Sequence, residues 1–212
     1  MMVLGDAHAD DPAHRRVLLD TYASYAPEVV LQTGDLRYYE LPAPTWFVAG
    51  NNEDLDVIDA LRDGRSPPGT SNVTLLASTT ATLDGIRVAG LSGNFAPTRF
   101  ENARADLEGD RRRHFVEAEV ETAKSLVDID VFLTHEAPHG LLSVDGYDPG
   151  CVHVDAILRA VEPDLCLVGH HHEHAESTFG PTRVVALDPV WVANYRLEPA
   201  TLTLDRRPPP AG

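Results

Sequence analysis

The sequence predicts an α/β domain in which short buried strands alternate with helices. Apolar runs at 2–4, 28–32 and 45–49 are each followed closely by a glycine, as expected for strands that end in turns. Residues 11–25 carry apolar side chains at helical spacing. The C-terminal part of the chain is richer in strand-like segments. Strands that first alternate with helices and then follow one another favour a domain whose strands lie between helices.

The remaining elements follow from composition and turn signals. Residues 54–61 predict a helix with carboxylates in its first turn, where the helix dipole favours negative charge. The Gly, Pro and Ser content of 64–72 predicts a loop, and Asp84-Gly85 predicts a hairpin turn. We expect strands at 73–77, 79–83, 86–91, 130–133, 164–168, 183–187, 190–197 and 201–204, helices at 111–126 and 153–161, and a loop at 92–110.

The chain has 212 residues, enough for one α/β domain with a full core. We expect a single domain over 1–205 and a Pro-rich, disordered tail over 206–212. Cys151 and Cys166 are too few for a disulfide framework, and we expect buried free thiols. No apolar run approaches the roughly 18 residues of a membrane span, and no signal peptide is evident. We therefore expect a cytoplasmic protein that has no membrane partner.

The charge of the chain is unusually negative. The formal net charge is -16, and Lys124 is the only lysine among 17 basic residues. Such a field repels nucleic-acid phosphates and acidic membranes unless metals or local Arg clusters offset it. Many carboxylates with almost no lysine indicate a salt-rich cytoplasm, as in a halophilic archaeon, because salt screens the repulsion. An acidic protein encoded by a GC-rich genome is the alternative.

Five short segments in the chain carry residues that commonly bind metals. They are Gly5-Asp6-Ala7-His8, Gly34-Asp35, Gly50-Asn51-Asn52-Glu53, Thr134-His135-Glu136 and Gly169-His170-His171-His172. Each segment alone could be a solvated turn, because Gly-Asp and Gly-Asn are common turn sequences. Together they predict one site, because each follows a predicted strand and ligands beyond the carboxyl ends of strands can converge. Asp, His and Asn suit Mn, Fe, Zn or Mg.

From Gly5 to about Pro189 the chain resembles the calcineurin-like metallophosphoesterases, and in particular their phosphodiesterase-type members. The family pattern is Gly-Asp-x-His, Gly-Asp, Gly-Asn-His-Asp/Glu, His and Gly-His-x-His. The resemblance implies a four-layer αββα sandwich of two mixed β-sheets flanked by helices. It also implies two divalent metal ions, from Mn, Fe, Zn, Ni or Mg, with Mn favoured. Asp6, His8 and His172 would hold one ion, Asn51, His135 and His170 the other, and Asp35 would bridge both.

The reaction implied by the resemblance is hydrolysis of a phosphoester, with a hydroxide between two metals attacking phosphorus in line. The chain departs from the family at Asn52, which stands where the family usually has His. An amide can donate a hydrogen bond but cannot act as a general acid near neutral pH. His139 could take over that catalytic role from the rim of the site, or it could be a solvated loop histidine.

Residues 90–100 resemble a segment of the RNA lariat debranching enzymes of the same superfamily. Asn94 and Arg99 could bind a substrate phosphate there, since the guanidinium fork pairs with phosphate oxygens; a structural loop is the alternative. Arg111-Arg112-Arg113 is the only basic cluster. It opens a predicted helix, where the dipole disfavours cations, so carboxylates or an anionic ligand should compensate.

The leading hypothesis is therefore a metal-dependent phosphodiesterase that acts on a small phosphodiester or nucleotide-like substrate. A hydrolase that processes RNA or DNA, related to the debranching enzymes, is a second reading, and the net charge of -16 argues against it. A non-catalytic metal-binding scaffold is a third reading, and the seven metal-compatible residues in register argue against that. The oligomeric state stays open.

Overall fold

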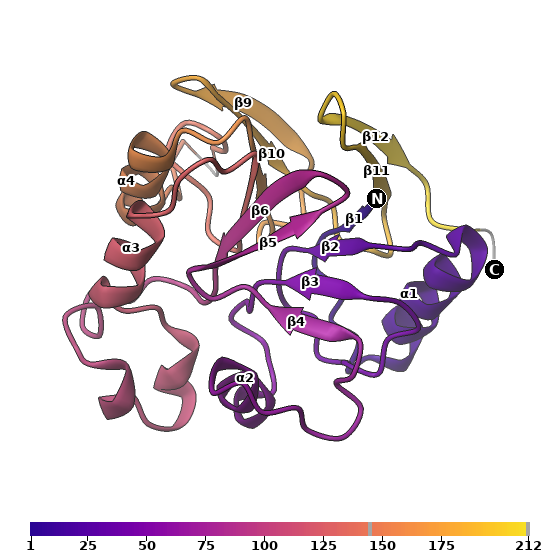
Figure 1. Ribbon diagram of the computed structural model, residues 1–212, viewed down its shortest axis with the longest axis horizontal. Helices are drawn as coiled ribbons and strands as arrows, with labels where there is room; N and C mark the ends of the chain where they lie inside the picture. Colours follow the sequence, from indigo (N-terminus) through magenta and orange to yellow (C-terminus); the bar gives the residue numbers. More distant parts are fainter. Residues whose placement is uncertain (144–145, 211–212) are drawn as a thin grey trace.

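Two six-stranded mixed sheets form the centre of the protein (Figure 1). The computed structural model describes residues 1–143 and 146–210. The first sheet has the order β12-β11-β1-β2-β3-β4 and the second β5-β6-β7-β8-β10-β9. The strands of the first sheet are β1 (Met2–Leu4), β2 (Val30–Gln32), β3 (Thr45–Phe47), β4 (Val73–Leu75), β11 (Asn194–Glu198) and β12 (Thr203–Arg207). Those of the second are β5 (Thr79–Leu83), β6 (Ile86–Leu91), β7 (Val131–Thr134), β8 (Leu165–Val168), β9 (Ala175–Phe179) and β10 (Thr182–Ala186).

A block of parallel strands lies at the centre of each sheet. Strands β1 to β4 run parallel in the first sheet, and β6, β7, β8 and β10 run parallel in the second. The antiparallel strands β11, β12, β5 and β9 flank these blocks. Within each block, all strands present their carboxyl ends at the same edge, which is where α/β proteins place their sites.

Among the described residues, four α-helices cover the outer faces of the two sheets. They are α1 (Pro12–Tyr25), α2 (Leu55–Arg62), α3 (Glu117–Lys124) and α4 (Val152–Val161). Along β7, Val131 and Leu133 belong to the core between the sheets, whereas Phe132 points into the core under α3 and α4. A third core joins α1 and α2 to the other face of the first sheet. This alternation, which follows from the pleat of a strand, confirms the predicted four-layer αββα sandwich.

Local signals set several element boundaries. The side chain of Asp11 accepts hydrogen bonds from the amides of Ala13 and His14 and so caps α1. The hairpin between β5 and β6 turns at Asp84 and Gly85, whose φ angles are 48° and 86°. Positive φ at both positions is typical of the type I′ turn that fits the twist of a hairpin.

The helix expected at 111–126 is interrupted in the structure. Two short 3-10 helices at Arg104–Asp106 and Gly109–Arg113 come first, and α3 begins only at Glu117. Asn94 forms a β-bridge with His114, and the Arg104 guanidinium donates to the carbonyls of Arg112 and His114. These contacts use backbone groups that a continuous helix would need, and for that reason the prediction was wrong here.

The C-terminal region also differs from the prediction. Strand β9, which was not predicted, pairs with β10 across a turn at Gly180. Arg206 and Arg207, expected to begin a disordered tail, are the last residues of β12. The Arg206 guanidinium donates to Asp188, which holds this end of the strand in place. Residues 211–212, the end of the tail expected over 206–212, lie outside the described residues.

Two further expectations concern the cysteines and the membrane. Cys151 and Cys166 are both buried and free, as predicted. No helix within the described residues is long and apolar enough to cross a membrane.

A charged cluster around Glu119 joins α2, α3 and the segment before α3. The Glu119 carboxylate accepts hydrogen bonds from the guanidinium groups of Arg62 and Arg104 and from the Val116 amide. The side chains of Arg62 and Glu119 are only 13% and 16% exposed. Burial strengthens such contacts and makes the loss of one partner costly.

We expect Glu119→Gln to lower the free energy of unfolding by about 2–3 kcal/mol, because two half-buried guanidinium groups lose their counter-charge. Chemical denaturation at fixed salt measures the change. Glu121→Gln is the matched control: it lies on the same helix, and its pair with Lys124 is exposed, so the loss should be below about 1 kcal/mol. Equal losses in the two variants would contradict the role assigned to Glu119.

Candidate metal centre

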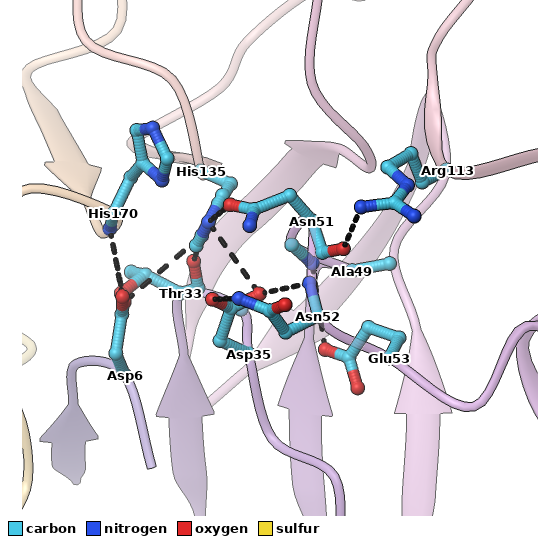
Figure 2. A network of polar contacts seen from close by, with 12 residues as sticks. Asp6, Thr33, Asp35, Ala49, Asn51, Asn52, Glu53, Arg113, His135 and His170 are labelled. Carbon is cyan, nitrogen blue, oxygen red and sulfur yellow. Dashed lines mark hydrogen bonds and ion pairs between the residues drawn. The ribbon is translucent and has the colours of Figure 1, made fainter. Parts of the chain in front are cut away.

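The predicted ligand residues converge where the carboxyl ends of the two parallel blocks meet. Asp6 and His8 follow β1, Asp35 follows β2, Asn51 and Asn52 follow β3, His135 follows β7, and His170 and His172 follow β8. Figure 2 shows Asp6, Asp35, Asn51, Asn52, His135 and His170 gathered above the strand ends. The two sheets therefore supply different parts of one cluster.

One side of the cluster contains Asp6, His8 and His172. His172 Nε2 lies 2.9 Å from Asp6 Oδ2 and 3.1 Å from His8 Nε2. His8 Nε2 is also 3.4 Å from Asp35 Oδ2. Two imidazole nitrogens that face each other beside two carboxylates form a set of donor atoms suited to a divalent cation.

The other side contains Asp35, Asn51 and His135. His135 Nε2 lies 3.0 Å from Asn51 Oδ1 and 3.6 Å from Asp35 Oδ1. Its other ring nitrogen, Nδ1, lies 2.9 Å from the carbonyl oxygen of Thr33, to which Nδ1–H can donate. A hydrogen bond of this kind fixes the tautomer that leaves Nε2 free as a metal ligand. Nε2 then faces two acceptor oxygens, an arrangement that a cation would satisfy.

Two groups of potential metal ligands can be defined by distance. Within the described residues, ligand atoms of Asp6, His8 and His172 lie within 4.8 Å of one another, and so do those of Asp6, Asp35 and His135. His170 donates its backbone amide to both carboxylate oxygens of Asp6, and its ring centroid lies 4.9 Å from that of His135. The structure therefore brings all seven predicted ligands to one place, with His170 in contact through its backbone.

The glycines that precede the ligands leave room for this convergence. A Cβ atom at Gly50 would lie 2.2 Å from Asp35 Oδ1, and one at Gly34 would lie 2.4 Å from His135 Nδ1. At Gly169 it would lie 2.6 Å from Asp6 Oδ1. Real Cβ atoms do not approach other atoms this closely, so these three positions require glycine for the cluster to close.

Four of the seven predicted ligand residues adopt backbone conformations that are rare outside glycine. The φ angles are 41° at His8, 53° at Asp35, 72° at His170 and 55° at His172. A left-handed conformation costs such residues on the order of 1–2 kcal/mol each and persists where surrounding structure enforces it. Strain of this kind is concentrated at functional sites.

The electrostatics of the cluster also fit a cation. Burial alone would raise the pKa of Asp6, but the charge of His135 and hydrogen bonds from His172 and the His170 amide outweigh burial and lower the pKa. The hydrogen bond to Asp6 raises the pKa of His172. Burial lowers the pKa of His135, but the charges of Asp6 and Asp35 outweigh burial and raise it. Positive charge is stabilised at this place, whether a proton or a metal carries it.

Asn52 and Glu53 hold the Asp35 carboxylate and its loop. The backbone amide of Asn52 donates to Asp35 Oδ1 at 2.7 Å, and the side-chain amide donates to Oδ2 at 2.9 Å. Glu53 is buried and accepts hydrogen bonds from the amides of Leu36 and Arg37 and from the Tyr39 hydroxyl. Burial raises the pKa of Glu53 to about 7 despite these hydrogen bonds.

The remaining predicted site residues lie at different distances from the cluster. The backbone amide and Nδ1 of His139 bond to Asp155 at 2.9 and 3.0 Å, which ties His139 to the start of α4. Asn94 lines a cavity beside the cluster together with Asn51 and His170. Arg99 donates to the carbonyl of Thr98 in a solvent-exposed hydrogen bond. The catalytic role of His139 and the substrate-binding roles of Asn94 and Arg99 stay predictions.

Sequence reasoning missed two residues next to the cluster. Trp191 stacks on His14, with ring centroids 3.8 Å apart, and its ring also lies 5.8 Å from that of His8 and 5.4 Å from that of His172. Arg113 Nη1 donates to the carbonyl of Asn51 at 3.2 Å, as Figure 2 shows. The Arg triplet was a signal for Arg113, whereas no local pattern marked Trp191.

The sequence matches the family model of calcineurin-like phosphoesterases over residues 1–174. The chain belongs to this family. The match confirms the predicted family, and residues 1–174 include all seven predicted ligand residues. The comparison with curated proteins found no match.

Several solved structures share the fold of this chain. TT1561 of Thermus thermophilus has a TM-score of 0.68 and 16% identity, over 98% of this chain and 97% of that one. A dimetal phosphatase from Danio rerio has a TM-score of 0.52 and 12% identity, over 90% and 82%. GAP50, described as the anchor in the inner membrane complex of Plasmodium, has a TM-score of 0.51 and 13% identity, over 91% and 72%. At such identities the likeness shows the fold.

We expect the stability that Glu53 contributes in the metal-free protein to depend on pH. The folded-state pKa of about 7 is above the ordinary value of 4.5 for a glutamate, so the protonated form is the one that folding favours. The contribution is fully present below about pH 4.5 and is lost as pH rises through about 7, by up to about 3 kcal/mol. Denaturation of wild type and Glu53→Gln at pH 5 and pH 8 measures it. The advantage of wild type over the neutral variant should shrink at pH 8, and an advantage that grows would contradict this assignment.

Proposed function

We propose that this family member is a metal-dependent phosphoester hydrolase that acts on phosphodiesters with two divalent metal ions. The observation that carries the proposal is the position of Asp35. Its two carboxylate oxygens face different histidines, Oδ2 towards His8 at 3.4 Å and Oδ1 towards His135 at 3.6 Å. A carboxylate placed in this way can be shared by two cations, one on each side of the cluster.

The residues fit two cations in the following way. Asp6, His8 and His172 would hold one, Asn51, His135 and His170 the other, and Asp35 would bridge them. Bound cations would supply a water of lowered pKa and neutralise charge on the phosphate oxygens. Mn is the favoured metal for both positions, although these ligand types also accept Fe, Zn, Ni and Mg. The Danio rerio neighbour is described as a dimetal phosphatase, so the fold accommodates such a centre.

The residues around this centre hold the candidate ligands in position. The two amide groups of Asn52 fix the Asp35 carboxylate through both oxygens. Thr33 orients His135 through its carbonyl. Burial of Asp6 and Asp35, each 1% exposed, excludes bulk water from the ligand oxygens and strengthens their attraction for cations.

Asn52 also bears on the type of ester. Its side-chain amide is engaged with Asp35, and an amide has no proton to give at neutral pH. Substrates whose leaving group departs without being protonated are therefore favoured. This supports activated diesters over alkyl monoesters as substrates. The excess of acidic residues supports activity at high salt, where the repulsion between the protein and an anionic substrate is screened.

Two other functions fit the fold less well. The net charge of -16 works against RNA or DNA as the substrate, because binding of their backbones relies on positive charge. A non-catalytic scaffold has a precedent in the fold, since GAP50 is described as an anchor. A scaffold, however, does not require strained ligand residues around two buried carboxylates.

We expect Asp35→Asn to lower hydrolysis of bis-p-nitrophenyl phosphate by more than about 100-fold, because loss of even the partners behind metal ligands costs roughly 10–100-fold. The assay runs in high salt with Mn, beside p-nitrophenyl phosphate. The rise in Tm caused by Mn should also disappear in this variant. Asp63→Asn, in an exposed pair with Arg65, is the control. If the protein binds Mn but hydrolyses neither ester, the proposed hydrolase function is contradicted and a non-catalytic scaffold is favoured.

We expect Asn52→His to raise the rate of hydrolysis of a dinucleoside monophosphate, whose leaving group is a nucleoside alkoxide, by at least about tenfold. The reason is that general acids contribute roughly 10²–10⁴-fold. The rate on a nitrophenyl diester should change much less, because nitrophenolate leaves without a proton. Asn52→Ala separates the gain of an acid from the loss of the hydrogen bond to Asp35. Equal changes on both substrates would show that protonation at this position is irrelevant.

A further inference from the structure

An open cavity of about 360 Å³ adjoins the candidate metal centre. Asn51 and His170 line it on the side of the predicted ligands, and Asn94, Asp110, Arg111, Arg113 and His114 line it elsewhere. A second cavity, of about 290 Å³, is lined by His8 and Asn52 among others and shares Asn51, Asp110 and Arg113 with the first. A molecule whose phosphorus lies at the metal ligands can therefore extend past Asn51 and Arg113 into the first cavity.

The lining of the first cavity contains two guanidinium groups, of Arg111 and Arg113, and one carboxylate, of Asp110, so it carries a net positive charge in an otherwise acidic protein. Arg113 spans the boundary of the two cavities and donates to the Asn51 carbonyl, with Asp110 as its counter-ion at 3.2 Å. Among the described residues, Arg112 and Arg113 have carboxylate partners within 4.0 Å and Arg111 has none. The guanidinium of Arg111 thus keeps its full capacity to pair with an anion, and guanidinium groups match phosphate oxygens in geometry.

Two side chains in the wall of the cavity have unused hydrogen-bonding capacity. Asn94 Oδ1 and His114 Nδ1 are buried and have no partner among the described residues. Burial and the nearby charge of Arg113 lower the pKa of His114, which keeps the imidazole neutral. An unpaired buried polar atom costs about 1–3 kcal/mol, and a small rotation towards a bound polar molecule relieves that cost.

The leaving group is constrained independently by Asn52. Because the amide is engaged with Asp35 and gives no proton, the favoured leaving group is a weak base. A phosphate monoester is such a group, since its second pKa is about 6. It is also anionic, and an anionic leaving group is what a cavity lined by Arg111 and Arg113 accommodates.

We propose that the substrate is a disubstituted pyrophosphate of the nucleoside diphosphate type, whose leaving phosphate is received by Arg111 and Arg113. The inference rests on the proposed hydrolase function and names its substrate class. The attacked phosphorus of such a molecule is a diester phosphorus. A bond forms between water oxygen and this phosphorus, and the bond to the bridging oxygen breaks. The leaving phosphate monoester takes the electron pair, and the water proton passes to solvent.

The test compares Arg111→Gln with Arg112→Gln at one ionic strength. Both variants remove one guanidinium from the same short helix, and Arg112 pairs with Asp56 and Asp59 instead of lining the cavity. Calorimetry measures binding of α,β-methylene-ADP, which resists hydrolysis, and of AMP to the Mn-loaded protein. Kinetics compare ADP-ribose with thymidine 5′-(p-nitrophenyl) phosphate, which is a diester without a second phosphate. Circular dichroism checks that both variants are folded.

We expect Arg111→Gln to weaken binding of α,β-methylene-ADP by about tenfold or more, as for loss of a charged hydrogen bond, and binding of AMP by much less. The kcat/KM for ADP-ribose should fall by a similar factor, with the nitrophenyl diester nearly unchanged. Arg112→Gln should change neither the preference for binding α,β-methylene-ADP over AMP nor the preference for hydrolysing ADP-ribose over the nitrophenyl diester. Arg111-dependent binding of α,β-methylene-ADP without any hydrolysis would support the site and reject the hydrolase. The inference would be overturned if the nitrophenyl diester is hydrolysed but Arg111→Gln and Arg112→Gln have the same kcat/KM for ADP-ribose. That result would still support the proposed hydrolase function.

Discussion

Two carboxylates, Asp6 and Asp35, lie almost without solvent exposure where the edges of the two sheets meet, and their burial constrains every segment around the site. Taking one charge out of water costs several kcal/mol even after relaxation. Each carboxylate is therefore surrounded by donors: the His170 amide and His172 at Asp6, and both amide groups of Asn52 at Asp35. Because these donors come from different strands of both sheets, holding the two carboxylates also fixes how the sheets meet.

The same constraint explains the backbone around the site. The ligands approach one another so closely that a Cβ atom at Gly34, Gly50 or Gly169 would lie within 3 Å of a ligand atom. His8, Asp35, His170 and His172 are in left-handed conformations that cost free energy. The four-layer core provides the stability that tolerates this strain, because three hydrophobic clusters anchor the strands immediately before the ligands. A rigid scaffold thus presents strained but pre-positioned ligand atoms, which lowers the reorganisation needed to bind cations.

Charge is distributed unevenly around the centre. The chain as a whole carries -16, yet the segment between β6 and α3 places guanidinium groups on the cavity beside the ligands. Arg104 and Glu119 pin this segment to α3, and Arg112 ties it to Asp56 and Asp59 at α2. The positive charge at the rim is therefore held by structure rather than by a mobile loop. An anionic substrate of the proposed kind would meet repulsion over most of the surface and attraction at this rim.

From the sequence, strand periodicity and the glycines in four of the five ligand-bearing segments predicted the α/β class, the strand ends and the seven candidate ligands, because these signals are local. The resemblance to the family added the two-sheet sandwich. Tertiary structure alone decided how residues distant in the chain combine. The helix expected from 111 to 126 is interrupted because Asn94 and Arg104 use the backbone groups of 112–114. Arg113 reaches Asn51, 62 positions away, and Trp191 stacks on His14 beside the ligands. Asn52 marks a departure from the family in sequence, but only the fold shows its amide engaged by Asp35. Such pairings depend on which strand ends become neighbours, and no local pattern records that.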